Sequence, residues 1–263
     1  NYSLVKRLEN HPILTSVCSI FIIMGKKFAD KTLAEIVILN HNFIQVFEDY
    51  KIDYFNDGKS TLQEICLESG LEISLLESVL NKIDKHKINN HLDFQNMGLD
   101  DLIKHIEQVH HHFIRKNLPE LSLFANKIQL TEKLSKIHQG VIELFITLTE
   151  EIMVHMEDEE NIIFPHIRYH YNPLKYITPE KGLTDHEGLT AYESLMNQHE
   201  DVSAILKQIS RLSDGYNPHK NDSTLMISFY KKLHEFEEDL HVHIHLENNI
   251  LFPQAQLLQT KKI

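Results

Sequence analysis

Residues 240–253 read LHVHIHLENNILFP, and they place a histidine and a glutamate on the apolar face of a helix. Phe236, Leu240, His243, Glu247 and Leu251 recur at helical spacing, so His243 and Glu247 interrupt an otherwise apolar stripe. Burying an imidazole and a carboxylate is unfavourable unless the two groups are paired or bind a metal. The stretch therefore predicts a buried site as well as a helix.

The same arrangement occurs earlier in the chain, where Leu148, Ile152, His155, Glu159 and Ile163 share one helical face. Both segments carry His-x-x-x-Glu, and a four-residue step puts the two side chains on one face about one turn apart. Each segment then closes on an aliphatic residue followed by Phe-Pro. Two such helices can bring two imidazoles and two carboxylates to a common point.

The composition favours metal binding by imidazole and carboxylate groups. The chain has 263 residues, of which 42% are hydrophobic, so it can build a core. It has 26 Lys and Arg against 38 Asp and Glu, and the net charge of -12 argues against nucleic acid or anionic lipid as the main partner. Because Cys18 and Cys66 are the only cysteines, neither a disulfide framework nor a thiolate zinc site is expected. The 19 histidines point to metal chemistry instead.

No membrane segment is expected near the N-terminus. The most apolar run, Ile13 to Met24, is too short to span a bilayer, and no A-x-A cleavage site follows it. We expect residues 1–30 to be an N-terminal extension that is disordered or not native, because Met24-Gly25-Lys26-Lys27 resembles a natural start. The expected compartment is the cytoplasm.

Residues 31–88 are expected to form a small helical domain. Thr32-x-x-Glu35 and Ser74-x-x-Glu77 match the capping box that opens a helix. Ser60 can cap another helix, and Gly70 can end it. Three or four short helices follow from these signals.

Residues 95–258 carry four long helical patterns without sustained strand-like alternation. Pro119 is expected to stop the first pattern, and loops containing Pro and Gly separate the last three. The expected fold class is therefore all-α, an up-down four-helix bundle preceded by a small helical domain. The four patterns cover Leu99–Leu118, Thr131–Tyr169, Leu189–Leu212 and Ser223–Leu258.

The two helices without a His-x-x-x-Glu pair are expected to supply further histidines. His199 lies on an apolar stripe of the third helix. In the first helix His110, His111 and His112 are consecutive, and periodicity weakly favours His110, since adjacent residues differ only by rotation. Four histidines and two glutamates would then converge in the core, a donor set that suits two irons bridged by carboxylates.

A ferritin-like site built from Glu-x-x-His is the competing interpretation. Glu107 and His110 have this spacing, and so do Glu238 and His241, but Glu238 falls on the solvent side of the stripe. In the plainest interpretation the inward histidines are core residues without a metal. Two buried carboxylates without a metal would, however, each cost several kcal/mol.

Other polar groups are expected to lie on the surface. His234, His241 and His245 do not share the inward face of their helix. In the acidic run of residues 157–160 only Glu159 is expected to turn inward, and Glu151 is as readily a solvated residue as a group near the metal.

Three motifs resemble those of the RIC family, hemerythrin-like di-iron proteins named for the repair of iron centres. The last helix, from Leu233 to Pro253, is closely similar to the last helix of that family. Residues 155–165, HMEDEENIIFP, resemble its His-Met-x-x-Glu-Glu-x-x-Leu-Phe-Pro segment, and residues 110–119, HHHFIRKNLP, resemble its first-helix motif. The resemblance covers about residues 30 to 258.

The resemblance implies a ligand set, and it chooses His111 in the first helix. The family's ligand there lies seven residues before the leucine of Leu-Pro, which is Leu118 here, so the motif indicates His111 and not His110. Two non-haem iron ions, bridged by carboxylates and by an oxo group when oxidised, are the implied cofactor. The implied ligands are His111, His155, Glu159, His199, His243 and Glu247.

The smaller domain departs from the family at one place. Where the family has Ile-Asp-Tyr-Cys-Cys-Gly-Gly-Lys, residues 52–59 read IDYFNDGK, so Phe55 and Asn56 replace both cysteines. A thiol, cluster or redox role for that pair is therefore not expected here, although the helical scaffold can persist.

The resemblance implies a role in repairing iron–sulfur clusters damaged by nitric oxide or oxidants. The expected activity is iron supply by a binding protein more than turnover by an enzyme, with nitric oxide reduction at the di-iron site left open. The implied partners are damaged iron–sulfur proteins and the diatomic molecules NO and O2, without nucleic acid or membrane; a homodimer through residues 31–88 is left open. The alternative is a hemerythrin-like module that senses, stores or reduces NO or O2 and repairs nothing.

Overall fold

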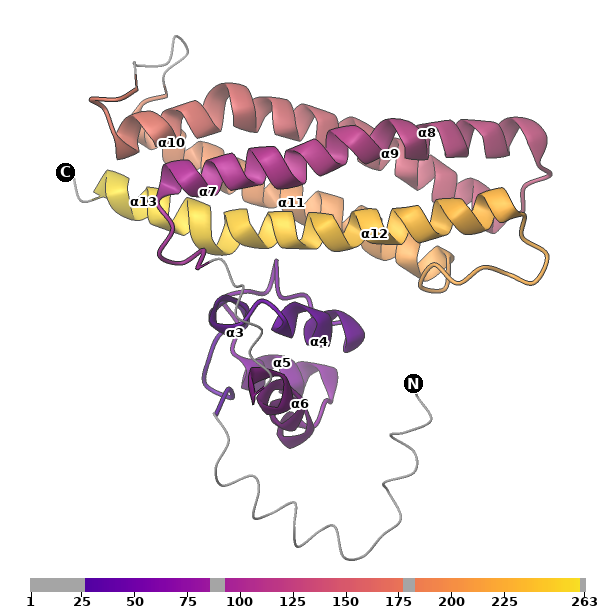
Figure 1. The fold of residues 1–263 in the computed structure, drawn as a ribbon, viewed down its shortest axis with the longest axis horizontal. Helices are drawn as coiled ribbons and strands as arrows, with labels where there is room; N and C mark the ends of the chain where they lie inside the picture. Colours follow the sequence, from indigo (N-terminus) through magenta and orange to yellow (C-terminus); the bar gives the residue numbers. More distant parts are fainter. Residues whose placement is uncertain (1–26, 86–92, 177–182, 261–263) are drawn as a thin grey trace, which may run out of the picture. The chain divides into compact units, whose positions relative to one another are not determined.

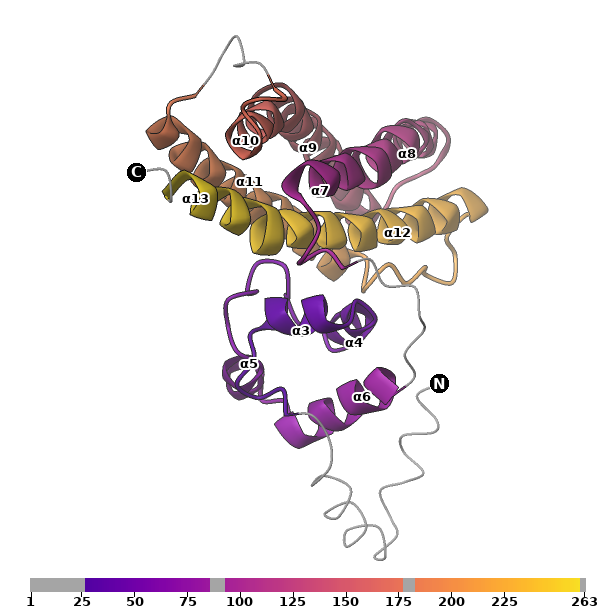
Figure 2. The ribbon, with the colours of Figure 1, turned by 60° about the vertical axis from the view of Figure 1, so that its left-hand side comes forward.

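The computed structural model describes residues 27–85, 93–176 and 183–260, and the regular structure in these ranges is helical (Figures 1 and 2). The prediction of an all-α fold is confirmed. The chain divides between Leu92 and Asp93 into two compact units, which are considered separately. Most of the expected N-terminal extension lies outside the described residues. Among the described helices none has the length and apolar character needed to cross a membrane.

The described residues of the smaller unit form four short helices around an aromatic core. Phe28, Phe43 and Tyr54 are fully buried, and the rings of Phe28 and Phe43 meet edge to face at 5.5 Å. Phe55, one of the two residues that stand in place of cysteines, is buried and packs edge-on against Tyr54 at 5.3 Å. The helices are α3 (Leu33–Leu39), α4 (Phe43–Asp49), α5 (Leu62–Ser69) and α6 (Ile73–Lys85).

The capping predictions for this unit are partly wrong. The capping box of Thr32 and Glu35 is confirmed. The residue that caps α5 is Thr61 and not Ser60, because Thr61 forms its own capping box with Glu64. Glu77 closes no capping box either: its Oε1 accepts hydrogen bonds from the backbone N–H groups of Phe28 and Ala29 at 2.7 and 3.0 Å, so it secures the start of the described chain.

The larger unit is a bundle of four helical rods in which consecutive rods run in opposite directions (Figure 1). This confirms the predicted up-down arrangement. In the core, α9 packs along α11 and α8 along α12. The first rod contains α7 (Leu99–His105), η2 (Ile106–His111) and α8 (His112–Thr131); the second contains α9 (Lys136–Asp158), η3 (Glu159–Ile163) and α10 (Phe164–Tyr171); the third is α11 (Asp185–Leu212); the fourth contains α12 (Thr224–Leu246), η4 (Glu247–Leu251) and α13 (Phe252–Thr260).

Three of these rods widen locally into a π-helix. In η3 the N–H of Phe164 bonds to the carbonyl of Glu159, and in η4 the N–H of Phe252 bonds to the carbonyl of Glu247, each five residues back. The residue after each phenylalanine is a proline, which cannot donate the next hydrogen bond and clashes with the carbonyl four residues earlier. The wider turn therefore accommodates Phe-Pro, and each helical rod continues beyond the motif.

The first predicted helix boundary is wrong. Pro119 does not stop the first helix, because α8 runs on to Thr131 with Leu121, Ala125 and Ile128 buried. The packing of these side chains outweighs the local cost of a proline inside a helix. The second helix accordingly starts at Lys136, where the side chain of Ser135 accepts a hydrogen bond from the N–H of His138.

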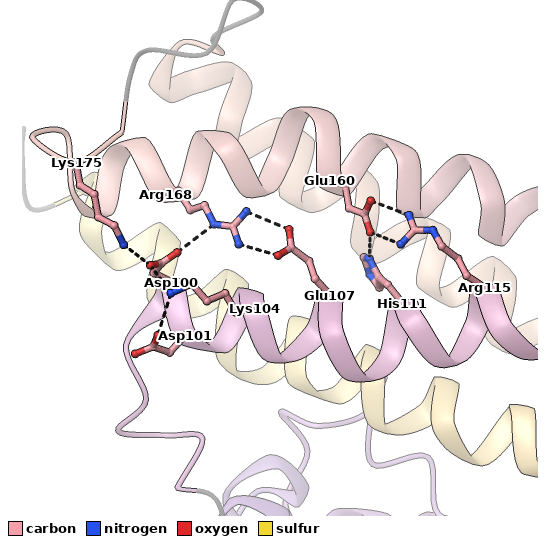
Figure 3. A network of polar contacts seen from close by, with 9 residues as sticks. All are labelled: Asp100, Asp101, Lys104, Glu107, His111, Arg115, Glu160, Arg168 and Lys175. Carbon is pink, nitrogen blue, oxygen red and sulfur yellow. Dashed lines mark hydrogen bonds and ion pairs between the residues drawn. The ribbon is translucent and has the colours of Figure 1, made fainter.

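An ion-pair network joins the first and second rods at one end of the bundle (Figure 3). Arg168 binds Glu107 through both terminal nitrogens at 3.0 and 2.8 Å and binds Asp100 through Nε at 3.1 Å. Asp100, which is 7% exposed, also accepts a hydrogen bond from Lys175 at 2.7 Å. This network fixes α10 against α7.

We expect Asp100→Asn to lower the free energy of unfolding by about 1–2 kcal/mol at neutral pH. Burial raises the pKa of Asp100, but hydrogen bonds from Lys175, Tyr176, Lys104 and Arg168 lower it further, so it lies well below its ordinary value of 3.8. The stabilisation is therefore fully present above about pH 3.8 and declines as the pH falls towards the lowered pKa. Urea unfolding of both proteins at pH 7, 4 and 2.5 measures this, and a difference that does not depend on pH would contradict it.

Close packing at Gly188 of α11 predicts a second effect on stability. A Cβ on Gly188 would collide with the imidazole of His166 and lie 3.0 Å from Nε2 of Gln259, and both side chains are buried. We expect Gly188→Ala to destabilise the protein by about 1–3 kcal/mol because these neighbours must shift. Gly140→Ala in α9 is the matched control, since its Cβ would meet only the end of Leu212 at 3.2 Å. Thermal unfolding should separate the two variants clearly.

Candidate metal centre

Six buried side chains meet in the middle of the larger unit. Every rod contributes: η2 supplies one histidine, α9 and η3 a histidine and a glutamate, α11 one histidine, and α12 and η4 a histidine and a glutamate. Each of the six is at most 5% exposed. They are His111, His155, Glu159, His199, His243 and Glu247, the full set that the sequence predicts.

The six side chains form two four-membered groups that share both glutamates. In the first group, His111 and His243 lie with their Nε2 atoms 3.2 Å apart. The Nε2 atom of His111 is 3.2 Å from Oε2 of Glu159, and that of His243 is 3.1 Å from Oε1 of Glu247. We call this group site A.

Site B has the same composition. The Nε2 atoms of His155 and His199 are 2.8 Å apart. Oε1 of Glu159 lies 2.9 Å from Nε2 of His155, and Oε2 of Glu247 lies 3.2 Å from Nε2 of His199. Each carboxylate thus turns one oxygen towards site A and the other towards site B.

The carboxylate oxygens show that this donor set fits a pair of cations. All four oxygens of Glu159 and Glu247 are buried, and none receives a hydrogen bond of good geometry from the described residues. Buried carboxylates without such partners are costly unless they are paired with a positive charge. Two imidazole nitrogens and two shared carboxylate oxygens at each site form a set that suits divalent transition metals.

The electrostatics of the site keep the carboxylates ionised. Burial raises the pKa of Glu159, but the surrounding histidines lower it more, so it lies well below the ordinary value. The pKa of Glu247 is also lowered: burial and the charge of Glu159 raise it, while His243 and His199 lower it further. Burial lowers the pKa of His155, but Glu159 raises it to about 9 overall. In His243 burial dominates, so its pKa is lowered and the neutral, ligating form is favoured.

Hydrogen bonds at Nδ1 orient three of the four rings. The Nδ1 of His111 lies 2.6 Å from Oε1 of Glu160. The Nδ1 of His155 lies 2.7 Å from Oε1 of Gln198, and the Nδ1 of His199 lies 2.8 Å from Oδ1 of Asn248. These oxygens accept from Nδ1–H, which leaves the Nε2 lone pair directed at the centre, as is usual for metal-binding histidines. The Nδ1 of His243 has no hydrogen-bond partner among the described residues.

The partner of His111 is itself held by an arginine (Figure 3). Arg115 binds Glu160 through two hydrogen bonds, of 2.8 and 2.7 Å. Both residues are partly exposed, whereas His111 is fully buried. Figure 3 shows the carboxylate of Glu160 between the guanidinium of Arg115 and the imidazole of His111.

On the first rod the structure places His111, and not His110, in the site. His110 is also buried, but it faces another partner: its Nδ1 lies 3.1 Å from Oδ1 of Asp239. Its ring stacks on that of His243 at 5.8 Å, with an interplanar angle of 6°. The family motif, which indicates His111, therefore agrees with the geometry, whereas helical periodicity, which favours His110, does not.

The other expectations about polar groups are partly wrong. His241 and His245 are 8% and 1% exposed, so neither is a solvated residue, although His234 is exposed as expected. Glu160 is not simply a solvated residue, because its carboxylate accepts a hydrogen bond from the ring of His111. Glu151 is exposed, as expected of a solvated residue.

The residues that the sequence did not identify are the hydrogen-bond partners Glu160, Gln198 and Asn248. A signal for them exists, because each is the immediate neighbour of a predicted ligand. A helix places adjacent residues about 100° apart, which is close enough to reach a ring on a neighbouring rod.

A small, mainly apolar cavity adjoins the centre. It is lined by the rings of His155, His199 and His243 and by the side chains of Ile152, Met156, Val202, Leu240 and Ile244. An apolar space beside metal-binding side chains can admit a small uncharged molecule.

Comparison with known proteins agrees with this geometry. The model of the family described as hemerythrin HHE cation binding domain matches residues 101–255, which include all six side chains of the centre. The "Iron-sulfur cluster repair protein YtfE" of Edwardsiella ictaluri (strain 93-146) is 30% identical over 229 residues, covering 87% of this chain and 97% of that protein. Proteins of the same name from Enterobacter sp. (strain 638) and Escherichia coli O81 (strain ED1a) are 29% and 28% identical with the same coverage.

Proposed function

Since this chain belongs to the hemerythrin HHE cation-binding family, and within it to the iron–sulfur cluster repair proteins, we propose that it binds two iron ions and supplies iron to damaged iron–sulfur clusters. The clients would be iron–sulfur proteins damaged by nitric oxide or oxidants, and the expected compartment is the cytoplasm. The named relatives are described as iron–sulfur cluster repair proteins, which supports this role.

The arrangement of the two carboxylates is the observation that carries the proposal. Glu159 and Glu247 each belong to both four-membered groups, so two metal ions bound there would be bridged twice. The four histidines divide evenly between the two sites. Iron held by only two imidazoles and two shared carboxylates at each site would have few protein ligands and would therefore be exchangeable.

The residues of the chain prepare the site before any metal arrives. The ionised carboxylates supply the negative charge, while Gln198 and Asn248 hold the rings of His155 and His199 with Nε2 directed inward. The apolar side chains around the cavity limit the access of water. At each site only two imidazoles would hold the metal besides the shared carboxylates, so protonation or displacement of these imidazoles would favour its release.

A second function, the binding of NO or O2 by a hemerythrin-like module without repair, is favoured by one observation. The apolar cavity touches three of the four ligand rings and suits a diatomic molecule better than a charged one. If this is the function, the protein would form a reversible adduct and keep its iron.

The experiment is metal analysis followed by a repair assay. Anaerobically purified full-length protein should contain about two irons per chain and, once oxidised, show the absorption bands of an oxo-bridged pair. The loaded protein is then incubated with an iron–sulfur enzyme damaged by nitric oxide, alongside the variant His243→Ala/Glu247→Ala. Recovery of enzyme activity with the wild type alone supports iron supply. Equal recovery with both proteins would overturn it, and a reversible adduct without recovery would favour the second function.

A further inference from the structure

The site is built from two halves that repeat along the chain. His111 corresponds to His199, His155 to His243, and Glu159 to Glu247, and the same number of residues separates each pair. The correspondence extends to packing: Phe164 stacks on His111 at 5.7 Å, and its counterpart Phe252 stacks on His199 at 6.3 Å. The two sites are therefore related by an internal repeat of the ligands and Phe-Pro motifs, in which η3 corresponds to η4, whereas η2 has no counterpart in the regular helix α11.

The repeat fails at two of the positions that hold the ligand rings. Asn248, which accepts from His199, corresponds to Glu160, so the His111 ring is held by a carboxylate instead of an amide. Gln198, which accepts from His155, corresponds to His110. His110 gives no such hydrogen bond to His243, because its Nδ1 faces Asp239 and its ring lies flat over that of His243.

Both departures fall on site A. Site B has two rings, each held by a neutral amide oxygen. Site A has one ring held by the Arg115–Glu160 pair and one ring, that of His243, with no hydrogen bond at Nδ1 from the described residues.

We propose that the two metal sites are inequivalent and that site A releases its metal first, by loss of His243, while Arg115 and Glu160 keep His111 in position. This inference rests on the proposed function, because it assigns the exchangeable iron to one of two bound irons. Glu160 and Arg115 act through His111 and are positioning residues.

The physical reason is the effect of a hydrogen-bond partner on a metal-binding imidazole. Such a partner fixes the ring orientation and raises the basicity of the ligating nitrogen, and its loss typically costs about 10–100-fold in metal affinity. A metal that dissociates stepwise leaves its least restrained ligand first, and His243 is that ligand. Glu160, the anionic partner of His111, strengthens the binding of that imidazole to the metal. His111 therefore stays bound while His243 leaves.

The test compares rates of iron loss in full-length protein loaded with two ferrous ions per chain under anaerobic conditions. An excess of a ferrous chelator that absorbs on binding iron is added, and absorbance is followed. The wild type should release its iron in two phases of equal amplitude. Gln198→Ala, which removes a partner at site B, should accelerate the second phase about 10-fold and leave the first unchanged.

His110→Gln is the decisive variant, because it gives His243 the residue that already holds its counterpart, His155. It should slow the first phase about 10-fold. His110→Leu, which fills a similar volume without an acceptor, is the matched control and should not slow it. Glu160→Gln, which keeps the shape of the partner but removes its charge, should accelerate the first phase; circular dichroism confirms that each variant remains helical.

The outcomes are separable from those of the proposed function. A protein that binds no iron pair overturns the proposed function itself. A protein that binds two irons but releases both in one phase overturns the inference alone. The same holds if Gln198→Ala accelerates the first phase, or if His110→Gln and His110→Leu behave alike.

Discussion

Glu159→Gln/Glu247→Gln is expected to reduce bound iron from about two ions per chain to below about 0.2. Both carboxylates contribute one oxygen to each site, so the double replacement removes all the negative charge from the centre. A neutral amide is a much poorer ligand for iron than a carboxylate, and four imidazoles alone do not bridge two cations. Metal analysis after anaerobic reconstitution and gel filtration measures the effect.

The control for this variant is Glu151→Gln/Glu157→Gln. These two glutamates lie on the same helix as His155 but are exposed, so they should leave the iron content near two. Retention of more than one iron by the double variant of the shared glutamates would contradict the bridging arrangement. The same variant should also fail to restore activity to a damaged iron–sulfur enzyme.

Removal of the metal is expected to cause the second large effect, a loss of stability. A ligand that binds only the folded state stabilises it by about 4 kcal/mol when its free concentration is 1,000 times the dissociation constant. For a unit of this size that corresponds to a fall of about 10 °C in Tm when iron is removed by a chelator. The direction follows from the structure, because without cations the carboxylate oxygens of Glu159 and Glu247 stay buried and receive no hydrogen bond from the described residues.

The control is the chelator itself applied to Glu159→Gln/Glu247→Gln. This variant has no iron pair to lose, so its Tm should be the same with and without chelator. Differential scanning calorimetry on the four samples gives the comparison. Equal Tm values for the iron-loaded and iron-free wild type would show that the centre adds nothing to stability.

The sequence predicted the ligands best where two of them share a helix. His155 with Glu159 and His243 with Glu247 stand out because each pair interrupts an apolar stripe, and this pattern depends only on regular helical geometry. His199 interrupts a stripe on a helix that stays regular throughout, so its inward position could also be predicted.

The choice between His110 and His111 shows where prediction from α-helical periodicity fails. Both residues lie in η2, a π-helical segment with more residues per turn than an α-helix. Counting in steps of 3.6 across η2, from apolar residues on both sides of the histidines, therefore introduces an angular error and selects the preceding residue. The family motif avoids this error because it records the position directly and assumes no helical geometry.

The partners of the ligand rings could not be predicted from pattern alone. Glu160 lies in an acidic run and Asn248 in a polar one, so both read as surface residues. Their function depends on which rod lies opposite, and that is decided by packing. The burial of His241 and His245 was missed because it also depends on packing against other rods. Helical periodicity identifies only the most apolar face of a helix.

The π-helical segments have a consequence for how such a centre can arise. Each of η2, η3 and η4 contains a position of the centre, His111, Glu159 or Glu247, and a π-helical turn is an α-helical turn with one residue added. One added residue rotates everything after it by about 100°. In the first rod, where His111 closes η2, the added residue decides which of the neighbouring histidines faces the centre, so the insertion or deletion of a single codon there can exchange one candidate ligand for another without any substitution.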